Sequence, residues 1–245
     1  MSEPVADTSA PEPVLRGAAK REARREELLA TVPSWYSGTL HLVWIHLSTL
    51  GAIGGSLWAL RDPQIWEWAL IPLFLLIANL FEWWVHKEPL HHPYPGLKLL
   101  YARHAKRHHV FFTDAEMALR SPRELALLLF PPYMIPAMVI LLSPVALGLG
   151  VLRWNLAWIF LASAFAYYLL YEWLHLLHHL PRESWWGRRA WAARLRLHHW
   201  RHHDPKRMLA GNFNVSFPFA DWLLRTTLPS EGEAEGDSSS DPGAA

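Results

Sequence analysis

The sequence contains no cysteine among its 245 residues. Disulfides, iron–sulfur clusters, thiolate-bound haem and zinc–thiolate sites all require cysteine, so each of them is excluded for this chain. Any metal that the protein binds must therefore be held by nitrogen and oxygen ligands.

The chain also has almost no net charge, because 23 Lys and Arg residues are balanced by 22 Asp and Glu residues. Nucleic-acid-binding surfaces concentrate basic residues on one face, and the sequence predicts no such partner. Hydrophobic residues instead make up 51% of the chain, with 15 Trp, and they lie in long runs between charged blocks. This segregation is typical of an integral membrane protein.

Four apolar runs are long enough to cross a bilayer, since a span needs about 20 residues. They cover residues 39–60, 64–85, 133–150 and 154–174. The third is the end of a longer run, 125–150, whose prolines predict a kinked or interfacial start. We therefore expect an all-α fold with a four-span membrane domain over residues 36–228.

The basic residues predict the orientation of these spans. All but two of the Lys and Arg residues lie in the N-terminal segment, in 86–123 and in 181–225. With four spans these three segments share one side of the membrane, and the positive-inside rule makes that side cytoplasmic. Both termini and the segments after the second and fourth spans are therefore expected in the cytoplasm.

The two ends of the chain are expected to be tails. Residues 1–35 predict a basic tail, disordered over 1–14 and carrying a short charged helix from Arg16. That helix fits either a solvated surface helix or an anchor on an anionic leaflet. Residues 229–245 predict an acidic, disordered tail. Within the domain, after the fourth span, the segment from Trp185 to Trp191 predicts a helix in the headgroup plane.

Histidine is the most informative residue type, with 15 copies. Most of them form four clusters beside the second and fourth spans: His86 and His91; His104, His108 and His109; His175, His178 and His179; His199, His202 and His203. Neutral imidazole is the commonest metal ligand in proteins, and helix positions i, i+3 and i+4 share a face. Each helical cluster therefore predicts rings directed at one point, with His104 and His108 as an i, i+4 pair. The expected topology gathers all four clusters at the cytoplasmic membrane face.

The number of imidazoles predicts two metal ions rather than one. About ten nitrogens give each ion four or five ligands, whereas a closed structural zinc site needs only four. Imidazole suits Zn, Cu, Fe and Ni, so the ligand type leaves the metal open. A dinuclear centre with open positions at the edge of a bilayer favours O2 chemistry on a lipid chain, for which iron is the usual metal, although zinc can replace it in a purified form. His41, His46, His92 and His198 are expected to be ordinary interfacial residues.

The four motifs resemble those of the fatty acid hydroxylase / sterol desaturase superfamily. They read Glu82-Trp-Trp-Val-His86-x4-His91, His104-x3-His108-His109-x4-Asp114, Tyr171-Glu172-x2-His175-x2-His178-His179 and His199-x2-His202-His203. The stretch from Gly211 to Thr226 resembles the closing segment of that superfamily. The second motif departs from the H-x2-H-H spacing that is frequent in its lipid 2-hydroxylases.

The resemblance implies a membrane-bound, non-haem di-iron oxidoreductase with a cytoplasmic helical cap. Such an enzyme uses O2 and two electrons to hydroxylate or desaturate a lipid such as a fatty acyl chain, a sterol or a carotenoid. The clustered histidines would be its iron ligands, with His178 either a ligand or a bystander. No electron-carrying domain is fused to this chain, so a small cytochrome or a ferredoxin with its reductase is the expected donor.

Two acidic residues in the motifs are candidates for orienting ligand imidazoles, namely Asp114 and Glu172. The alternatives are a helix cap for Asp114 and an interfacial carboxylate for Glu172. Asn212 and Asp221 are expected to support the loop that packs under the metals.

A second interpretation is a membrane haem- or metal-binding protein without oxygenase activity. Haem ligands would be single histidines on facing helices within the bilayer, and only His41 and His46 lie inside a span. A metal transporter would place ligands near the membrane midplane, and the first and third spans lack such charged or ligating residues.

Overall fold

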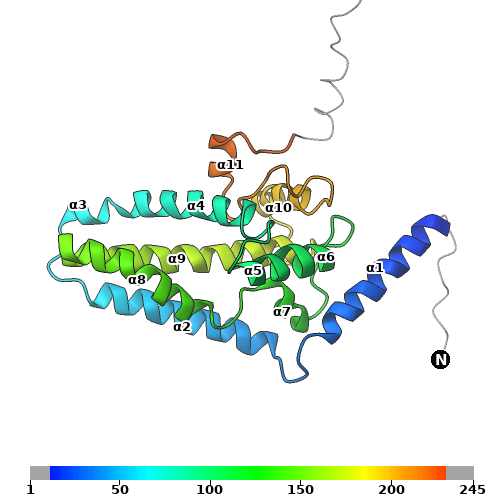
Figure 1. Ribbon diagram of the computed structural model, residues 1–245, viewed down its shortest axis with the longest axis horizontal. Coiled ribbons are helices and arrows are strands. Elements are labelled where there is room, and N and C mark those ends of the chain that lie inside the picture. The colour runs from blue at the N-terminus through cyan, green and yellow to red at the C-terminus, as the bar shows by residue number, and fades with distance from the viewer. Residues whose placement is uncertain (1–11, 230–245) are drawn as a thin grey trace, which may run out of the picture.

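The computed structural model describes residues 12–229, and this part of the chain is built from helices (Figure 1). In chain order the elements are α1 (Glu12–Ala30), α2 (Gly38–Trp58), α3 (Ile65–Trp68), α4 (Ile71–Lys87), α5 (Lys98–Arg103), the π-helical turn η1 (His104–His108), α6 (His109–Phe111), the 3-10 turn η2 (Pro122–Glu124), α7 (Leu125–Leu128), α8 (Met134–Leu152), α9 (Trp154–His179), α10 (Ala190–His202) and α11 (Phe219–Leu223). The expected all-α fold is confirmed. Residues 1–11 and the acidic residues 230–245 lie outside the described residues.

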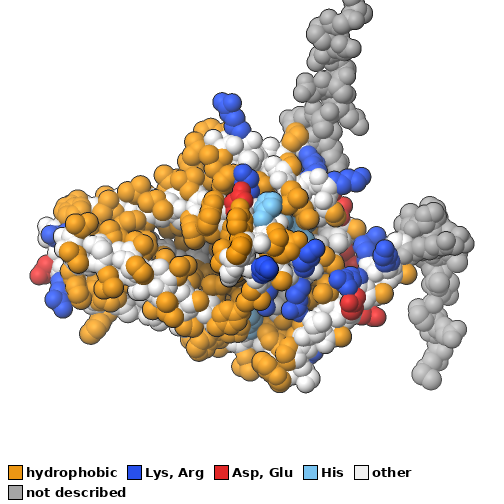
Figure 2. Space-filling view, in the orientation of Figure 1, with side chains coloured by type: hydrophobic (Ala, Val, Ile, Leu, Met, Phe, Trp, Pro, Cys, Tyr) orange, Lys and Arg blue, Asp and Glu red, His pale blue; other side chains and the backbone are white. Residues whose placement is uncertain are grey.

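Four of these segments are long and apolar enough to cross a membrane, as predicted: Gly38–Trp58, Ile65–Lys87, Met134–Leu152 and Trp154–His179. They run side by side, and α9 packs against α2, α4 and α8 (Figure 1). Half of the α9 window is buried, against 11% for α8, so α9 forms the centre of the bundle. The remaining faces carry exposed apolar side chains, which suit contact with lipid (Figure 2).

Local sequence explains where the spans begin and break. The Ser37 hydroxyl caps α2 by accepting a hydrogen bond from the Leu40 amide at 3.3 Å. The second span breaks between α3 and α4, where Pro72 stands in the first turn of the new helix. The proline-rich start expected for the third run becomes α7, followed by a non-helical stretch over residues 129–133 before α8. The fourth helix continues past the predicted residue 174 to His179 and so carries a histidine cluster on its last turns.

The shorter helices form a cap at one end of the bundle. Elements α5 to α7, α10 and α11 gather where α4 and α9 end (Figure 1). Lys and Arg side chains are frequent around this cap, whereas apolar side chains dominate the bundle (Figure 2). The topology therefore brings all four histidine clusters to one end, as the sequence predicted.

Helix α1 packs onto this cap. It begins at Glu12, before the Arg16 start expected from the sequence. Its Arg25 is buried, lies 2.7 Å from a Glu124 carboxylate oxygen and stands over the Phe111 ring at 4.1 Å. Leu28 joins the same apolar core. The helix is therefore docked on the protein, which neither of the two sequence interpretations described.

The segment after α9 differs from the expected headgroup-plane helix. Residues 182–187 form turns, and α10 begins only at Ala190. Gly187 lies so close to the Pro181 carbonyl that an added Cβ would approach it to 2.3 Å, which explains the tight turn. Trp185 and Trp186 remain exposed at this turn, as an interfacial role requires.

Candidate metal centre

Nine buried histidines form two compact groups of potential ligand atoms. The first histidine group contains His86, His91, His104, His109 and His202, and the second contains His108, His179, His199 and His203. Within each group the ligand nitrogens all lie within 4.8 Å of one another. Two groups of this kind are consistent with the two metal positions that the sequence predicted.

The groups do not follow the sequence clusters, and η1 explains why. The expected i, i+4 pairing of His104 with His108 is wrong: His104 belongs with His109 in the first group, and His108 belongs to the second. Residues 104–108 form a π-helical turn, in which the His109 amide donates to the His104 carbonyl five residues earlier. This wider turn brings positions i and i+5 together, and π-turns often occur at functional sites.

Helix α10 also supplies both groups. His199 and His203 are four residues apart on one face, and their Nε2 atoms are 3.0 Å apart in the second group. His202 lies on the neighbouring face, and its Nε2 is 3.1 Å from that of His91 in the first group. The helix therefore runs between the two positions and links them.

The separations between ring nitrogens match those of ligands around one ion. His86 and His104 place their Nε2 atoms 2.8 Å apart, and the second group has spacings of 3.0 to 3.3 Å. Ligands at about 2.1 Å from a metal lie about 3.0–3.4 Å from each other at right or tetrahedral angles. The donor set therefore fits a bound metal ion in each group.

Backbone carbonyls fix the tautomers that metal binding needs. The Nδ1 atom of His108 donates to the Leu127 carbonyl at 3.2 Å, and that of His203 donates to the Phe112 carbonyl at 2.5 Å. A carbonyl can only accept, so in each neutral ring Nε2 carries a lone pair. These two Nε2 atoms are 3.2 Å apart, so two acceptors face each other. A cation between them removes this repulsion, which makes the pair the strongest single indication of a metal.

Burial keeps these rings neutral. It lowers the pKa of His108, His203, His104 and His109 well below the usual value, and the neighbouring imidazoles lower each pKa further. The same cause lowers the pKa of His202 to about 4. Neutral imidazole is the form that binds metal, so no proton competes with the ion near neutral pH.

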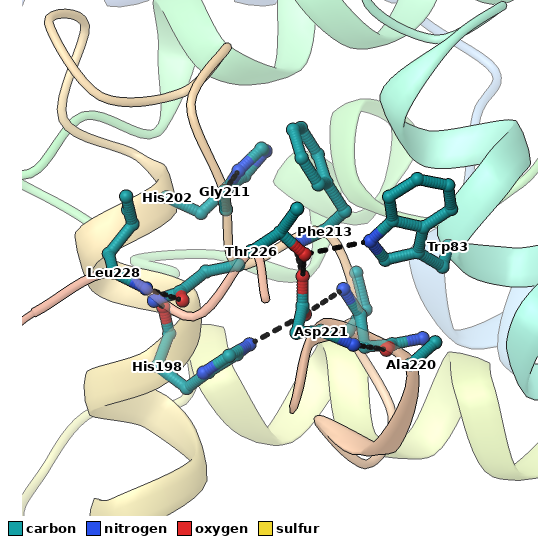
Figure 3. Close-up of polar contacts among 12 residues, drawn as sticks. Trp83, His198, His202, Gly211, Phe213, Ala220, Asp221, Thr226 and Leu228 are labelled. Atoms are coloured by element: carbon teal, nitrogen blue, oxygen red, sulfur yellow. Dashed lines mark hydrogen bonds and ion pairs between the residues drawn. The ribbon is translucent and has the colours of Figure 1, made fainter. Parts of the chain in front are cut away.

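A short loop at residues 211–216 orients three histidines from three helices. The Gly211 carbonyl accepts from His202 Nδ1 at 3.0 Å (Figure 3), and the Phe213 carbonyl accepts from His86 Nδ1. The Val215 carbonyl accepts from His178 Nε2 at 2.8 Å. Gly211 is required at its position because a Cβ there would lie 2.0 Å from the Thr226 carbonyl.

Asp221 supports the 211–216 loop through hydrogen bonds, as the sequence predicted. Its carboxylate accepts from the Phe213 and Asn214 amides at 2.9 and 2.7 Å, from Thr226 Oγ1 at 2.6 Å and from His198 Nε2 at 3.0 Å (Figure 3). Burial alone would raise the pKa of Asp221, but these hydrogen bonds outweigh it and the pKa falls below its ordinary value. The ionised carboxylate therefore acts as a fixed acceptor. Asn212 helps, since its side chain donates to the His198 carbonyl.

Glu82 holds the other end of the loop, and sequence reasoning missed its role. Its carboxylate accepts from the amides of Val215 and Ser216, from the Ser216 hydroxyl and from the Tyr167 hydroxyl. It is buried one turn before His86 on α4. The sequence did carry a signal for this role, because Glu82 is an acidic residue inside an apolar span. Burial of a carboxylate there is costly unless it is fully hydrogen-bonded.

The remaining predicted ligands lie beside the two groups. His175 is buried with its Nε2 3.3 Å from that of His108, so it adjoins the second group. His178 directs Nε2 at Val215 instead, and its buried Nδ1 has no hydrogen-bond partner among residues 12–229. Ligand roles for both stay predictions.

The two acidic candidates contact other parts of the site. Glu172 accepts from the Phe130 amide at 3.1 Å and the Tyr168 hydroxyl at 2.9 Å. The Asp114 carbonyl accepts from the Trp200 indole at 2.7 Å. Among the described residues, neither carboxylate is hydrogen-bonded to a clustered histidine, so their orienting roles stay predictions.

The four other histidines lie outside both groups. His41 bonds to the Tyr36 hydroxyl and the Phe130 carbonyl, and His46 bonds to the Leu42 carbonyl. His198 pairs with Asp221, and His92 contacts the Lys87 carbonyl.

An apolar pocket of about 90 Å³ reaches both histidine groups. Its lining residues are Leu90, Leu99, Leu100, Arg103, His104, His108, Leu127, Leu128, Leu129, Phe130, Pro131, Tyr133, Met134, Tyr171 and His175. Leu99 and Tyr133 are 58% and 52% exposed, which places the rim of the pocket at the surface near the start of α8. The apolar pocket therefore connects the candidate metal centre with the boundary between bundle and cap.

Comparison with known proteins agrees with this architecture. Residues 71–226 match the fatty acid hydroxylase family, a range that includes both histidine groups and the closing segment. Comparisons with curated proteins and with solved structures found no match. The matched range covers more than half of the chain, and we conclude that the protein belongs to the fatty acid hydroxylase family.

Proposed function

We propose that this protein is a membrane-bound di-iron oxidoreductase that hydroxylates or desaturates a lipid with O2. The observation that carries the proposal is the pair of histidine groups at the inner end of an apolar pocket. Their nitrogen ligands suit iron, and family membership makes an oxidoreductase the expected class.

The first histidine group would hold one ion, and the second group with His175 would hold the other. Bound iron would supply O2 activation for cleavage of an unactivated C–H bond. Hydroxylation inserts one oxygen atom and releases the other as water, with two electrons and two protons consumed. We propose a small cytochrome or a ferredoxin with its reductase as the electron donor.

The residues of this chain contribute orientation and water exclusion. Carbonyls at Leu127, Phe112 and Gly211 fix the ring tautomers, and buried leucines line the approach to the histidines. A lipid would reach the apolar pocket laterally from the bilayer, with its reacting carbon at the membrane boundary. We place this boundary on the cytoplasmic side.

Contacts among the rings favour this proposal over a haem protein. The His109 and His203 rings stack at 4.3 Å between centroids, and the other clustered rings contact one another directly. This arrangement leaves no space for a porphyrin between the imidazoles.

Metal analysis of the purified protein tests the proposal. Wild type should contain two irons per chain, and His108→Ala and His202→Ala should each lose metal, since they alter different groups. One zinc retained in wild type and in both variants would overturn the di-iron assignment.

Lipid analysis tests the activity. Cells that express the wild type should contain a lipid with one added oxygen or two fewer hydrogens, absent from cells that express the His108→Ala/His202→Ala double variant. Identical lipid profiles with a fully iron-loaded protein, electron donor and O2 present would contradict the oxidase assignment.

A further inference from the structure

The apolar pocket contains one cation that the proposed metal chemistry does not use. Arg103 is half-buried at the end of α5 and precedes His104 of the first histidine group. Its Nη2 donates to the carbonyls of Ala126 at 3.3 Å and Leu129 at 3.5 Å. These two bonds fix the guanidinium along the pocket wall.

Arg103 has no carboxylate within 4.0 Å among the residues that the structure describes. Buried Arg25 is paired with Glu124, whereas buried Arg196, like Arg103, donates only to backbone carbonyls but lies outside the apolar pocket. An unpaired charge in an apolar wall is costly, and a bound anion offsets that cost.

The rest of the pocket suits the head end of a lipid. Its wall is formed mostly by leucine, phenylalanine, proline and methionine. The Tyr171 hydroxyl, beside His175, has no hydrogen-bond partner within the described part of the chain. A mostly apolar cavity with a few convergent polar groups is the usual form of a small-molecule site.

Volume restricts what this site accepts. About 90 Å³ is room for only a few water-sized groups, far below the roughly 300 Å³ of a pocket that encloses a whole ligand. A carboxylate and its first carbons fit, while the rest of the chain would leave past exposed Leu99 into the bilayer. The planar guanidinium fork matches a carboxylate with two parallel hydrogen bonds.

We infer that Arg103 binds the carboxylate of a fatty acid, which enters the apolar pocket head first beside His104 and His108. The inference rests on the proposed lipid substrate and adds its head-group chemistry and its orientation. The carbons next to the carboxylate then lie closest to the metal centre.

Equilibrium binding of radiolabelled palmitate to the anaerobic, metal-loaded protein without reductant tests the inference. Hexadecanol, which has the same chain and no carboxylate, serves as the competitor. Wild type should bind palmitate at least tenfold more tightly than hexadecanol, and Arg103→Gln should lose that preference while its affinity for hexadecanol stays within twofold. Arg107→Gln, on the same helical segment and outside the pocket lining, should match wild type.

Because Arg103 also bonds to backbone carbonyls, Arg103→Lys provides a variant that keeps the charge and a donor. It should bind palmitate three- to tenfold more weakly than wild type. Equal palmitate affinity in wild type, Arg103→Gln and Arg103→Lys would overturn the inference. A wild-type preference for 1-palmitoyl lysophosphatidate over palmitate that is lost in Arg103→Gln would also overturn it, by assigning a phosphate head.

This assay needs no turnover, so its outcome is separate from that of the proposed function. Arg103-dependent palmitate binding without any lipid oxidation would leave the inference standing and contradict the oxidase. Lipid oxidation by a protein whose palmitate binding ignores Arg103 would do the reverse.

Discussion

At the scale of single residues, the candidate metal centre depends on backbone carbonyls as much as on imidazoles. His86, His178 and His202 come from α4, α9 and α10, yet each donates to a carbonyl of the 211–216 loop. A histidine that loses its carbonyl partner is free to adopt the other tautomer and turn its lone pair away from the metal. Residues that hold the loop should therefore affect metal binding without touching the metal.

Replacement of Glu82 tests this dependence. Glu82→Gln keeps the shape but puts an amide group opposite backbone and hydroxyl donors, so at least one buried donor loses its acceptor. We expect a loss of about 1–3 kcal/mol in unfolding free energy, together with weaker metal retention. Thermal unfolding in detergent and metal content after dialysis measure these effects. Glu27→Gln, exposed on α1, should change stability by less than about 0.5 kcal/mol; equal effects from both variants would contradict the role of Glu82.

His178 and His203 direct their Nε2 atoms at different partners, so we expect their replacement by alanine to change the metal content differently. His178 directs Nε2 at the Val215 carbonyl, whereas His203 directs Nε2 at His108 and His199. His203→Ala should therefore reduce the metal content from about two ions per chain to about one, while His178→Ala should keep about two. Elemental analysis of both variants, purified in parallel, decides between them. Loss of one ion in His178→Ala would contradict this expectation and show that metal binding needs His178, either as a ligand or through its bond to the Val215 carbonyl.

At the scale of elements, the sequence predicted the spans and the clusters but not how the clusters combine. Apolar length alone places α2, α8 and α9, and i, i+4 spacing pairs His199 with His203. The π-turn η1 reverses the expected pairing of His104 with His108, because one extra residue per turn leaves no mark in the spacing. Hydrogen bonds from distant backbone, such as the Gly211 carbonyl, carry no side-chain signal either. Local pattern predicts elements, whereas the site depends on contacts between them.

The docking of helix α1 also depends on contacts between elements that the local sequence pattern does not predict, and these contacts can be tested. Arg25 and Glu124 form an ion pair whose side chains are both only 3% exposed. Arg25→Ala would leave the Glu124 carboxylate buried without its charge partner, at a cost of about 3–5 kcal/mol. The neighbouring Arg24 pairs with Glu27 at the surface, so Arg24→Ala should cost no more than about 1 kcal/mol. Thermal unfolding of the two variants in the same detergent gives the comparison, and similar midpoints would show that α1 does not stabilise the cap.

At the scale of the whole molecule, the four spans separate the cap from the short turns at the opposite end of the bundle. The turn from Leu60 to Gln64 lies at the end of the bundle away from the cap, and α10 with its following turn lies in the cap (Figure 1). Basic residues gather around the cap, so the positive-inside rule predicts that the candidate metal centre faces the cytoplasm. In that orientation, a cytoplasmic electron donor would lie on the same side of the membrane as the candidate metal centre.

The absence of cysteine makes this orientation directly measurable, because any introduced thiol is the only one in the chain. Pro63 and Lys206 are exposed, the first in the turn between α2 and α3 and the second in the turn after α10. A membrane-impermeant maleimide should label Pro63→Cys in intact cells and label Lys206→Cys only after the membrane is permeabilised. The wild type should remain unlabelled in both conditions and serves as the control. Labelling of Lys206→Cys in intact cells, with Pro63→Cys protected, would place the metal centre outside the cytoplasm and would separate it from cytoplasmic reductants.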